Sequence, residues 1–499
     1  MHTAPSAESL EAISQELISV PYTETSSKGP YRVEEDDTAA LEQREAAKLA
    51  FEAGDDEWPD LTYPGLYDLP LDVSERGYLK LLTAVTKYAE TSGADDILVA
   101  DVVYEQIARK LAEVYSHKEI MRRLDRSGEA QRAKGDKRRK HLLDLADLSR
   151  HRSGIMSSEL YGDPEQEAFD AILAADIHRA LQALESTDET RKDIAIEFLE
   201  RLGLTPETAE SKMSAIKQER SAELEDDTID IIRGDVYTIF PSLESDMQPF
   251  REQKGSIKPI DALPAFQAAL RAMGSRWKVR LLRGKSEQAR TSDRNEEITF
   301  GELRKAFSPE KLWLTSIHEA GHAVRGGNAK AQKEPHRRIA LPGSADFEEG
   351  VQVVIEQILS GKKRVPGEKY YLQIGLLKGM YPAGGNKEQS YRTTYEIMWR
   401  RAALLQNGEL TEDKQTELKD SAYDSVMRTA RGNVRDNRDI NYFAGAYKAT
   451  QFMNETAKLP KHVRIARLRW MMSGMFDPTI PEHAAAFGGD PAAPYLEAA

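Results

Sequence analysis

The stretch SPEKLWLTSIHEAGHAVRGGN, residues 308–328, is the most informative part of this chain. It predicts a single helix. Ser308 is a good N-cap, Pro309 suits the first helical turn, and apolar residues recur at helical spacing from 312 to 324. The pair Gly326-Gly327 predicts where the helix ends.

This helix carries an H-E-x-x-H motif, His318-Glu319-Ala320-Gly321-His322. Two neutral imidazoles four residues apart point from the same face of a helix, which suits the binding of one Zn²⁺ ion. The glutamate between them is then placed to act as a general base on an activated water. A structural pair of histidines is the competing interpretation, because the motif also arises by chance in long chains.

The composition limits which classes of protein are possible. The chain has 499 residues, 40% of them hydrophobic, and a formal net charge of -14. It can form a large core in two or three domains, and it is not built to coat nucleic acid or an anionic membrane. It has no cysteine, which excludes disulfides, thiolate metal sites and a cysteine nucleophile. We find neither a signal-peptide pattern at the start nor an apolar run long enough to cross a bilayer, and therefore expect a cytoplasmic protein.

One basic concentration stands out, RRLDRSGEAQRAKGDKRRK at residues 122–140. Such a segment can contact nucleic acid or an acidic partner. Here acidic residues are mixed in and aromatic residues are missing, which favours a solvated helix-loop-helix. We therefore expect no nucleic-acid partner.

The order of the other elements predicts an α+β fold that is mostly helical. We expect a disordered tail (1–35), a helical N-terminal region (36–150), a zincin-like catalytic domain (151–480) and a C-terminal tail (481–499). Strand patterns lie at 236–240, 277–282 and 297–300, and a short helix is predicted at 262–273. A small mixed sheet beside the H-E-x-x-H helix is the order typical of zinc metallopeptidases with this motif.

A catalytic zinc site needs a third protein ligand and keeps one position for water. Residues 341–360, LPGSADFEEGVQVVIEQILS, predict a second helix with acidic residues near its start. Glu349 is the first candidate for the third ligand, and Glu348 and Glu356 are the alternatives. Acidic residues at a helix start also cap it and offset its dipole, so spacing alone leaves the choice open.

At several places the chain resembles the microtubule-associated tyrosine carboxypeptidases and their bacterial relatives, the QEGLA-motif family of zinc metallopeptidases. The resemblance spans residues 150–475 and rests on four segments in order: L-Y-G-D-P at 160–164, H-E-A-G-H with R-G at 318–326, F-E-E-G-V at 347–351, and R-x-x-R-G followed by R-D-I-N-Y-F-A-G at 428–445. Family members have one more residue between the two histidines. They also have a lysine and a leucine where this chain has Arg438 and Val351.

The resemblance implies roles for the remaining site residues. Glu349 corresponds to the family's zinc-binding glutamate, and the implied activity is that of a gluzincin-like metallocarboxypeptidase acting on a protein or peptide with a free C-terminus. Tyr442 becomes a candidate for stabilising the oxyanion, because a phenol donates a hydrogen bond without net charge. An arginine can hold a substrate's terminal carboxylate with two hydrogen bonds, and the candidates are Arg428, Arg431 and Arg438. A core tyrosine and surface ion pairs are the competing interpretations.

Two other functions compete with the carboxypeptidase. The same zinc site could serve an endopeptidase or an aminopeptidase. Alternatively, the chain could be a regulatory protein on a peptidase scaffold, with a structural zinc or none. Glu319 argues against the regulatory protein, because a structural site has no need of a general base.

Overall fold

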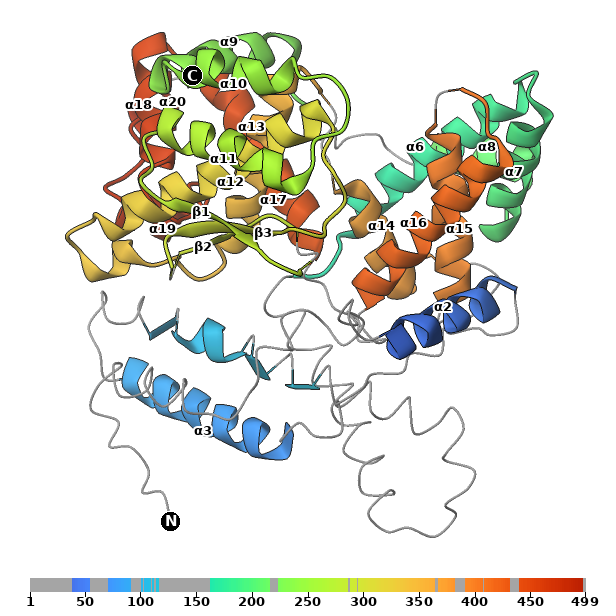
Figure 1. Cartoon of the computed structure of the whole chain (residues 1–499), viewed down its shortest axis with the longest axis horizontal. Coiled ribbons are helices and arrows are strands. Elements are labelled where there is room, and N and C mark those ends of the chain that lie inside the picture. The colour runs from blue at the N-terminus through green and yellow to red at the C-terminus, as the bar shows by residue number, and fades with distance from the viewer. Residues whose placement is uncertain are drawn as a thin grey trace. The chain divides into compact units, whose positions relative to one another are not determined.

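The computed structural model describes residues 38–53, 71–90, most of 100–115, 162–215, 223–381 and 391–496, with short gaps at 286–287, 294, 364–366, 407 and 431–438. This part of the chain is mostly helical and contains one three-stranded mixed sheet (Figure 1), so the predicted mostly helical α+β class is confirmed. The predicted disordered tail at 1–35 and the basic segment at 122–140 lie outside the described residues. No helix in the described part has the length and apolarity that a bilayer crossing requires.

The chain forms two compact units that are interleaved along the sequence. Unit 1 consists of residues 1–85, 106–221 and 367–440, and unit 2 of residues 86–105, 222–366 and 441–499. The H-E-x-x-H motif and the second predicted helix therefore both belong to unit 2. The domain boundaries expected from the sequence stay predictions.

The described part of unit 1 is helical. Its helices are α2 (Thr38–Ala53), α3 (Leu71–Ala89, of which residues 86–89 are assigned to unit 2), α6 (Gln166–Leu184), α7 (Glu189–Arg201), α8 (Pro206–Ala215), α14 (Glu368–Leu377), α15 (Tyr391–Leu404) and α16 (Glu412–Ala430). Phe51 of α2 packs edge-on against Tyr391 and Tyr395 of α15, with ring centres 5.8 and 5.3 Å apart. A buried ion pair between Arg401 and Asp176 joins α15 to α6.

Unit 2 contains the sheet, whose strands are β1 (Lys278–Leu282), β2 (Arg290–Ser292) and β3 (Glu297–Gly301). The order is β1-β3-β2, with β1 parallel and β2 antiparallel to β3. The strands predicted at 277–282 and 297–300 are confirmed. Strand β2 was not predicted, because three residues are too few to display an alternating pattern.

The sheet positions the H-E-x-x-H helix through a shared aromatic core. Helices α11 (Pro259–Ala272) and α12 (Pro309–Lys330) both pack against the sheet (Figure 1). Phe266 of α11 stacks on Phe300 of β3 at 4.7 Å between ring centres, and Phe307, just before α12, meets both rings at 6.2 Å. All three rings are fully buried. The start of α12 is therefore fixed to the same core as the central strand.

The other helices of unit 2 complete the scaffold. They are α9 (Asp226–Ile239), α10 (Leu243–Arg251), η4 (Pro335–Arg338), α13 (Ala345–Ser360), α17 (Ile440–Ala457), α18 (Lys461–Met471), α19 (Pro481–Ala486) and α20 (Ala493–Leu496). The predicted helices at 262–273 and 341–360 correspond to α11 and α13. The segment predicted as a C-terminal tail, 481–499, contains α19 and α20.

The strand predicted at 236–240 is wrong, because these residues form the end of α9. The β-branched residues there suggested a strand. Ile229, Ile232 and Val236, however, recur at helical spacing and are all buried. Two acidic residues, Asp226 and Asp227, also stand in the first turn, where they offset the helix dipole. Packing of the apolar face therefore overrides the local strand propensity.

The predicted end of α12 at Gly326-Gly327 is also wrong, because the helix continues to Lys330. Glycine at 326 does not end the helix. It leaves room for two side chains that lie against the helix there, Asp293 and Trp277. A Cβ on Gly326 would lie 2.4 Å from Asp293 Oδ1 and 3.0 Å from the Trp277 ring. The predicted N-cap is confirmed, since Ser308 Oγ accepts a hydrogen bond from the Lys311 backbone N–H.

Helices α13 and α17 cross at two glycines. A Cβ on Gly350 would lie 1.9 Å from the carbonyl carbon of Gly445, and a Cβ on Gly445 would lie 1.7 Å from the Asp346 carbonyl oxygen. The obstructing atoms are backbone, so neither helix could make room by moving a side chain. This crossing therefore fixes how α13 is rotated about its axis.

We expect Gly350→Ala to lower the free energy of unfolding by about 3 kcal/mol or more, because the added methyl overlaps backbone that cannot relax cheaply. Gly234→Ala in α9 is the matched control, since a Cβ there meets nothing within 4 Å. It should instead stabilise the helix by about 0.5–1 kcal/mol. Urea unfolding followed by circular dichroism measures both changes. Equal midpoints for Gly350→Ala and the wild type would contradict the close crossing.

The C-terminal segment of unit 2 is held by a neutral histidine. His483 is 4% exposed, and its Nδ1 accepts a hydrogen bond from the Asp477 backbone N–H at 3.1 Å. Burial lowers the pKa of His483 below its usual value, although the Asp477 carboxylate acts in the opposite direction. The unfolded chain therefore binds a proton more readily at this position than the folded chain does.

Stability should consequently fall as the pH drops below about 6.5, the usual histidine pKa of the unfolded chain, until the pH passes the lower pKa of His483 in the folded chain, because protonation favours the unfolded chain. His483→Asn keeps an acceptor near the Nδ1 position and removes the titration. It should flatten this part of the stability profile. Denaturant midpoints measured between pH 5 and pH 8 test the effect, with the exposed His462→Asn as control. An unchanged slope in His483→Asn would refute it.

Candidate metal centre

Two helix faces meet at the motif. On α12, His318, Gly321, His322 and Arg325 share one face, and on α13 the facing residues are Glu348, Glu349, Gln352 and Glu356. His318 contacts Glu356 near the end of α13, whereas His322 contacts Glu348 near its start, so the helices run antiparallel. A Cβ on Gly321 would lie 1.8 Å from Gln352 Oε1. Glycine at this motif position therefore leaves the space that the end of the buried Gln352 side chain occupies.

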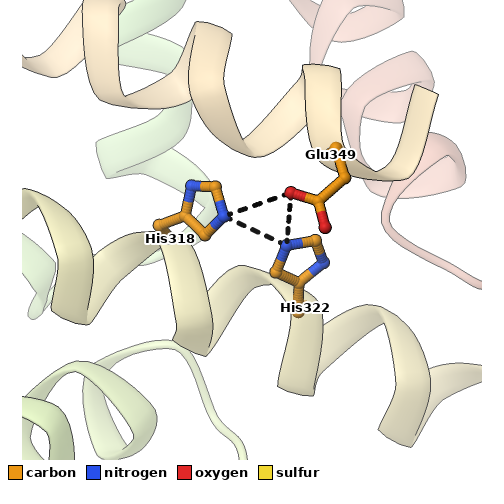
Figure 2. A group of neighbouring side chains, drawn as sticks. All are labelled: His318, His322 and Glu349. Atoms are coloured by element: carbon orange, nitrogen blue, oxygen red, sulfur yellow. Dashed lines mark hydrogen bonds and ion pairs between the residues drawn. The ribbon is translucent and has the colours of Figure 1, made fainter. Parts of the chain in front are cut away.

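Three side chains converge between these helices. Figure 2 shows His318 and His322 projecting from α12 toward Glu349 of α13. The two Nε2 atoms are 3.2 Å apart, and Glu349 Oε2 lies 3.8 Å from that of His318 and 3.9 Å from that of His322. A point equidistant from these three atoms lies about 2.1 Å from each, which matches zinc–nitrogen and zinc–oxygen bond lengths. The donor set thus fits a zinc ion with Glu349 as third ligand.

The two alternative glutamates contact the far nitrogens of the same imidazoles. Glu348 Oε1 lies 3.0 Å from His322 Nδ1, and Glu356 Oε1 lies 2.7 Å from His318 Nδ1. Glu348 accepts the Nδ1 proton of His322 and leaves Nε2 of that ring with its lone pair toward His318 and Glu349. Glu356 lies at ion-pair distance from His318 Nδ1, without the alignment of a hydrogen bond. Glu348 and Glu356 therefore lie on the far side of the two imidazoles from Glu349, where each can orient a ring.

A buried arginine holds Glu348 in place. Arg325 is fully buried, and its Nε donates to Glu348 Oε2 at 2.6 Å. Its other nitrogens donate to the backbone carbonyls of Met471 and Phe476, the second at 2.8 Å. Burial would raise the pKa of Glu348, but Arg325 and His322 hold it below its usual value. Glu348 is thus kept ionised, the state in which it can accept the imidazole proton.

The charges around the motif favour a cation. Burial alone would lower the pKa of His318, but Glu349 and Glu356 raise it well above the usual value. For His322, burial also lowers the pKa, and Glu348 and Glu349 raise it more strongly. The carboxylates that stabilise positive charge on the imidazoles would equally attract a divalent ion, whose binding displaces those protons.

Glu319 is positioned separately from the metal-binding groups. It is 7% exposed, and Thr291 of β2 donates from Oγ1 to Glu319 Oε2 at 2.7 Å. The same hydroxyl lies 3.2 Å from the Glu319 backbone carbonyl. One hydrogen bond therefore ties the candidate general base to an edge strand of the sheet.

The other predicted site residues are distributed as follows. Tyr442 is half-buried in the first turn of α17, one turn before the glycine that crosses α13. Arg428 belongs to α16 of unit 1, and its side chain is not among those described. Arg431 and Arg438 lie outside the described residues. The roles proposed for these residues stay predictions.

Sequence reasoning missed the contributions of Arg325 and Thr291. Arg325 stands on the histidine face of α12, three residues after His322, which is the signal that could have revealed it. Thr291 had no such signal, because its strand was not predicted.

Comparison of the chain with protein-family models, with characterised proteins and with solved structures gave no match.

We expect Glu348→Gln and Glu356→Gln each to weaken zinc binding about 10- to 100-fold, because a neutral amide holds and polarises the imidazole less well. Glu310→Gln is the matched control. It removes a carboxylate from the first turn of α12 that is exposed and paired with Lys362, away from the motif. Competition with a chelating dye measures the affinity. Equal affinities in all three variants would show that the two glutamates do not orient the ligands.

Proposed function

We propose that this chain is a zinc-dependent peptidase, and most simply a metallocarboxypeptidase that removes the C-terminal residue of a protein or peptide. The observation that carries the proposal is the convergence of His318, His322 and Glu349 beside the buried Glu319. A two-histidine, one-glutamate donor set leaves a coordination position for water, as hydrolytic zinc sites require.

Bound zinc in such a site supplies an activated water and polarises the scissile carbonyl. Glu319 takes the proton of that water and delivers it to the leaving amine. Thr291 holds one carboxylate oxygen of Glu319 by a hydrogen bond and leaves the other for proton transfer. Tyr442 is the candidate donor to the oxyanion.

The sheet favours a peptide as the substrate. Strand β2 pairs only with β3 in the described sheet, so its other side is an edge. An extended peptide can add to such an edge through backbone hydrogen bonds. Since Thr291 of β2 contacts Glu319, a peptide on this edge would pass the general base. An aminopeptidase or an endopeptidase would use the same groups, and the next section gives a reason to prefer the carboxypeptidase.

Metal analysis of the purified protein tests the proposal. We expect one zinc per chain in the wild type, loss of zinc in Glu349→Ala, and full retention in Glu319→Gln. The last variant should hydrolyse peptides about 10²- to 10⁴-fold more slowly, because only the proton transfer is lost. Mass spectrometry of the metal, together with a pooled-peptide cleavage assay, gives both readouts.

Each departure from this pattern has a distinct meaning. A well-folded wild type without zinc would remove the peptidase proposal and leave the regulatory protein. Zinc retained in Glu349→Ala would make Glu348 or Glu356 the third ligand. Unchanged hydrolysis in Glu319→Gln would remove the general base from Glu319.

A further inference from the structure

One buried arginine of the described chain is not paired with a carboxylate. The arginines Arg325, Arg400, Arg401 and Arg467 are buried, and each contacts a glutamate or an aspartate. Arg304 is 8% exposed, and within the described residues its Nε and Nη1 have no hydrogen-bond partner. Only Nη2 is engaged, by Gln288 Oε1 at 3.1 Å. A buried guanidinium with open donors is costly unless a ligand uses it.

Arg304 stands in the turn between β3 and α12, and its guanidinium stacks 3.8 Å from the centre of the Phe307 ring. Phe307 belongs to the aromatic core that anchors α12. The planar cation is therefore held on a rigid support. Stacking of this kind leaves the edges of the guanidinium available for hydrogen bonds in its plane.

Arg304 is linked to the candidate general base through one short segment. Gln288, which contacts Arg304, precedes Thr291 by three residues, and Thr291 donates to Glu319. Three residues span at most about 11 Å, so Arg304 and Glu319 are held near one another. Their charges interact as well: burial lowers the pKa of Arg304, and the Glu319 carboxylate raises it.

We propose that Arg304 binds the terminal α-carboxylate of the peptide substrate, a role that rests on the peptidase function proposed above. The side chain of Gln288 is exposed, and its amide oxygen holds the place that a carboxylate oxygen would take. A carboxylate displaces this neutral acceptor because it forms charge-assisted hydrogen bonds with the guanidinium, which are stronger. Arg304 is thus a specificity-determining residue that selects free C-termini.

The experiment compares two pools of the same octapeptides, one with free C-termini and one with C-terminal amides. Zinc-loaded wild type, Arg304→Gln, Arg304→Lys and Gln288→Ala are assayed for kcat and KM with each pool. Arg280→Gln is the matched control, because Arg280 lies on the same sheet with its guanidinium already bound to Glu297 at 2.7 and 2.9 Å. Zinc content and the melting temperature identify any variant that fails to fold.

We expect Arg304→Gln to lower kcat/KM for free acids about 100-fold, mainly through KM, and to leave zinc content unchanged. Arg304→Lys should recover part of this loss, and Gln288→Ala should keep or improve the KM. Equal losses of kcat/KM for free acids and amides would mean that Arg304 acts through the Glu319 carboxylate and does not bind the substrate's terminal carboxylate. This result would overturn the proposal. No loss for free acids would also overturn it while the peptidase stands.

Binding separates this proposal from the peptidase function. Retention of free-acid and amidated octapeptides is measured by mass spectrometry on zinc-loaded Glu319→Gln, with and without Arg304→Gln. One outcome is that the wild type hydrolyses neither pool while free acids are retained by Glu319→Gln and lost when Arg304→Gln is added. This result would support the carboxylate site at Arg304 and contradict the proposed peptidase activity. Equal retention of acids and amides would overturn the carboxylate site.

Discussion

The close packing of α12 on α13 is the constraint on which the candidate site depends. At Gly321 the end of the Gln352 side chain of α13 lies directly against the α12 backbone, in the space that a Cβ would take. Once the two faces are this close, each histidine of α12 lies between carboxylates of α13, at 2.7 Å for His318 and 3.0 Å for His322. The carboxylates raise the pKa of both imidazoles, so that negative charge gathered here is balanced by protons on the rings or by a bound cation. The packing and the charge pattern are therefore both compatible with a cation between the helices.

The rotation of α13 decides which acid faces the metal position. Glu348 and Glu349 are neighbours in sequence, so their side chains leave the helix about 100° apart. The crossing of Gly350 with Gly445 of α17 sets that rotation, because backbone atoms meet there directly. Glu349 Oε2 then lies within 4 Å of both Nε2 atoms, and Glu348 contacts Nδ1 of His322 instead. A residue nearly a hundred positions downstream thus decides which of the two acids faces the histidine Nε2 atoms.

Contacts between distant helices, such as that of α13 with α17, limit what the sequence could predict about the site. Helical period and capping predicted α12 and α13, and the motif predicted the histidine face, because these depend on neighbours within one or two turns. The choice among three glutamates depends on a contact with α17, and spacing could not resolve it. The strand expected at 236–240 was wrong for a related reason: its β-branched residues follow a helical period that only packing makes decisive. Strand β2, with the threonine that holds Glu319, was too short to carry a pattern.

The same logic extends to the end of α18 and the residues just after it, which hold the helices of the candidate site from a distant part of the chain. Arg325 reaches from the metal helix to the carbonyls of Met471 and Phe476, and Lys448 of α17 pairs with Asp346 of α13 and with the fully buried Asp477. A buried charge that loses its partner costs several kcal/mol, so these contacts cannot be removed singly without strain elsewhere. The segment after α18 consequently acts as part of the scaffold that orients His322 and fixes α13. The geometry of the His318, His322 and Glu349 cluster on α12 and α13 thus depends on α17 and on contacts with residues 471–477.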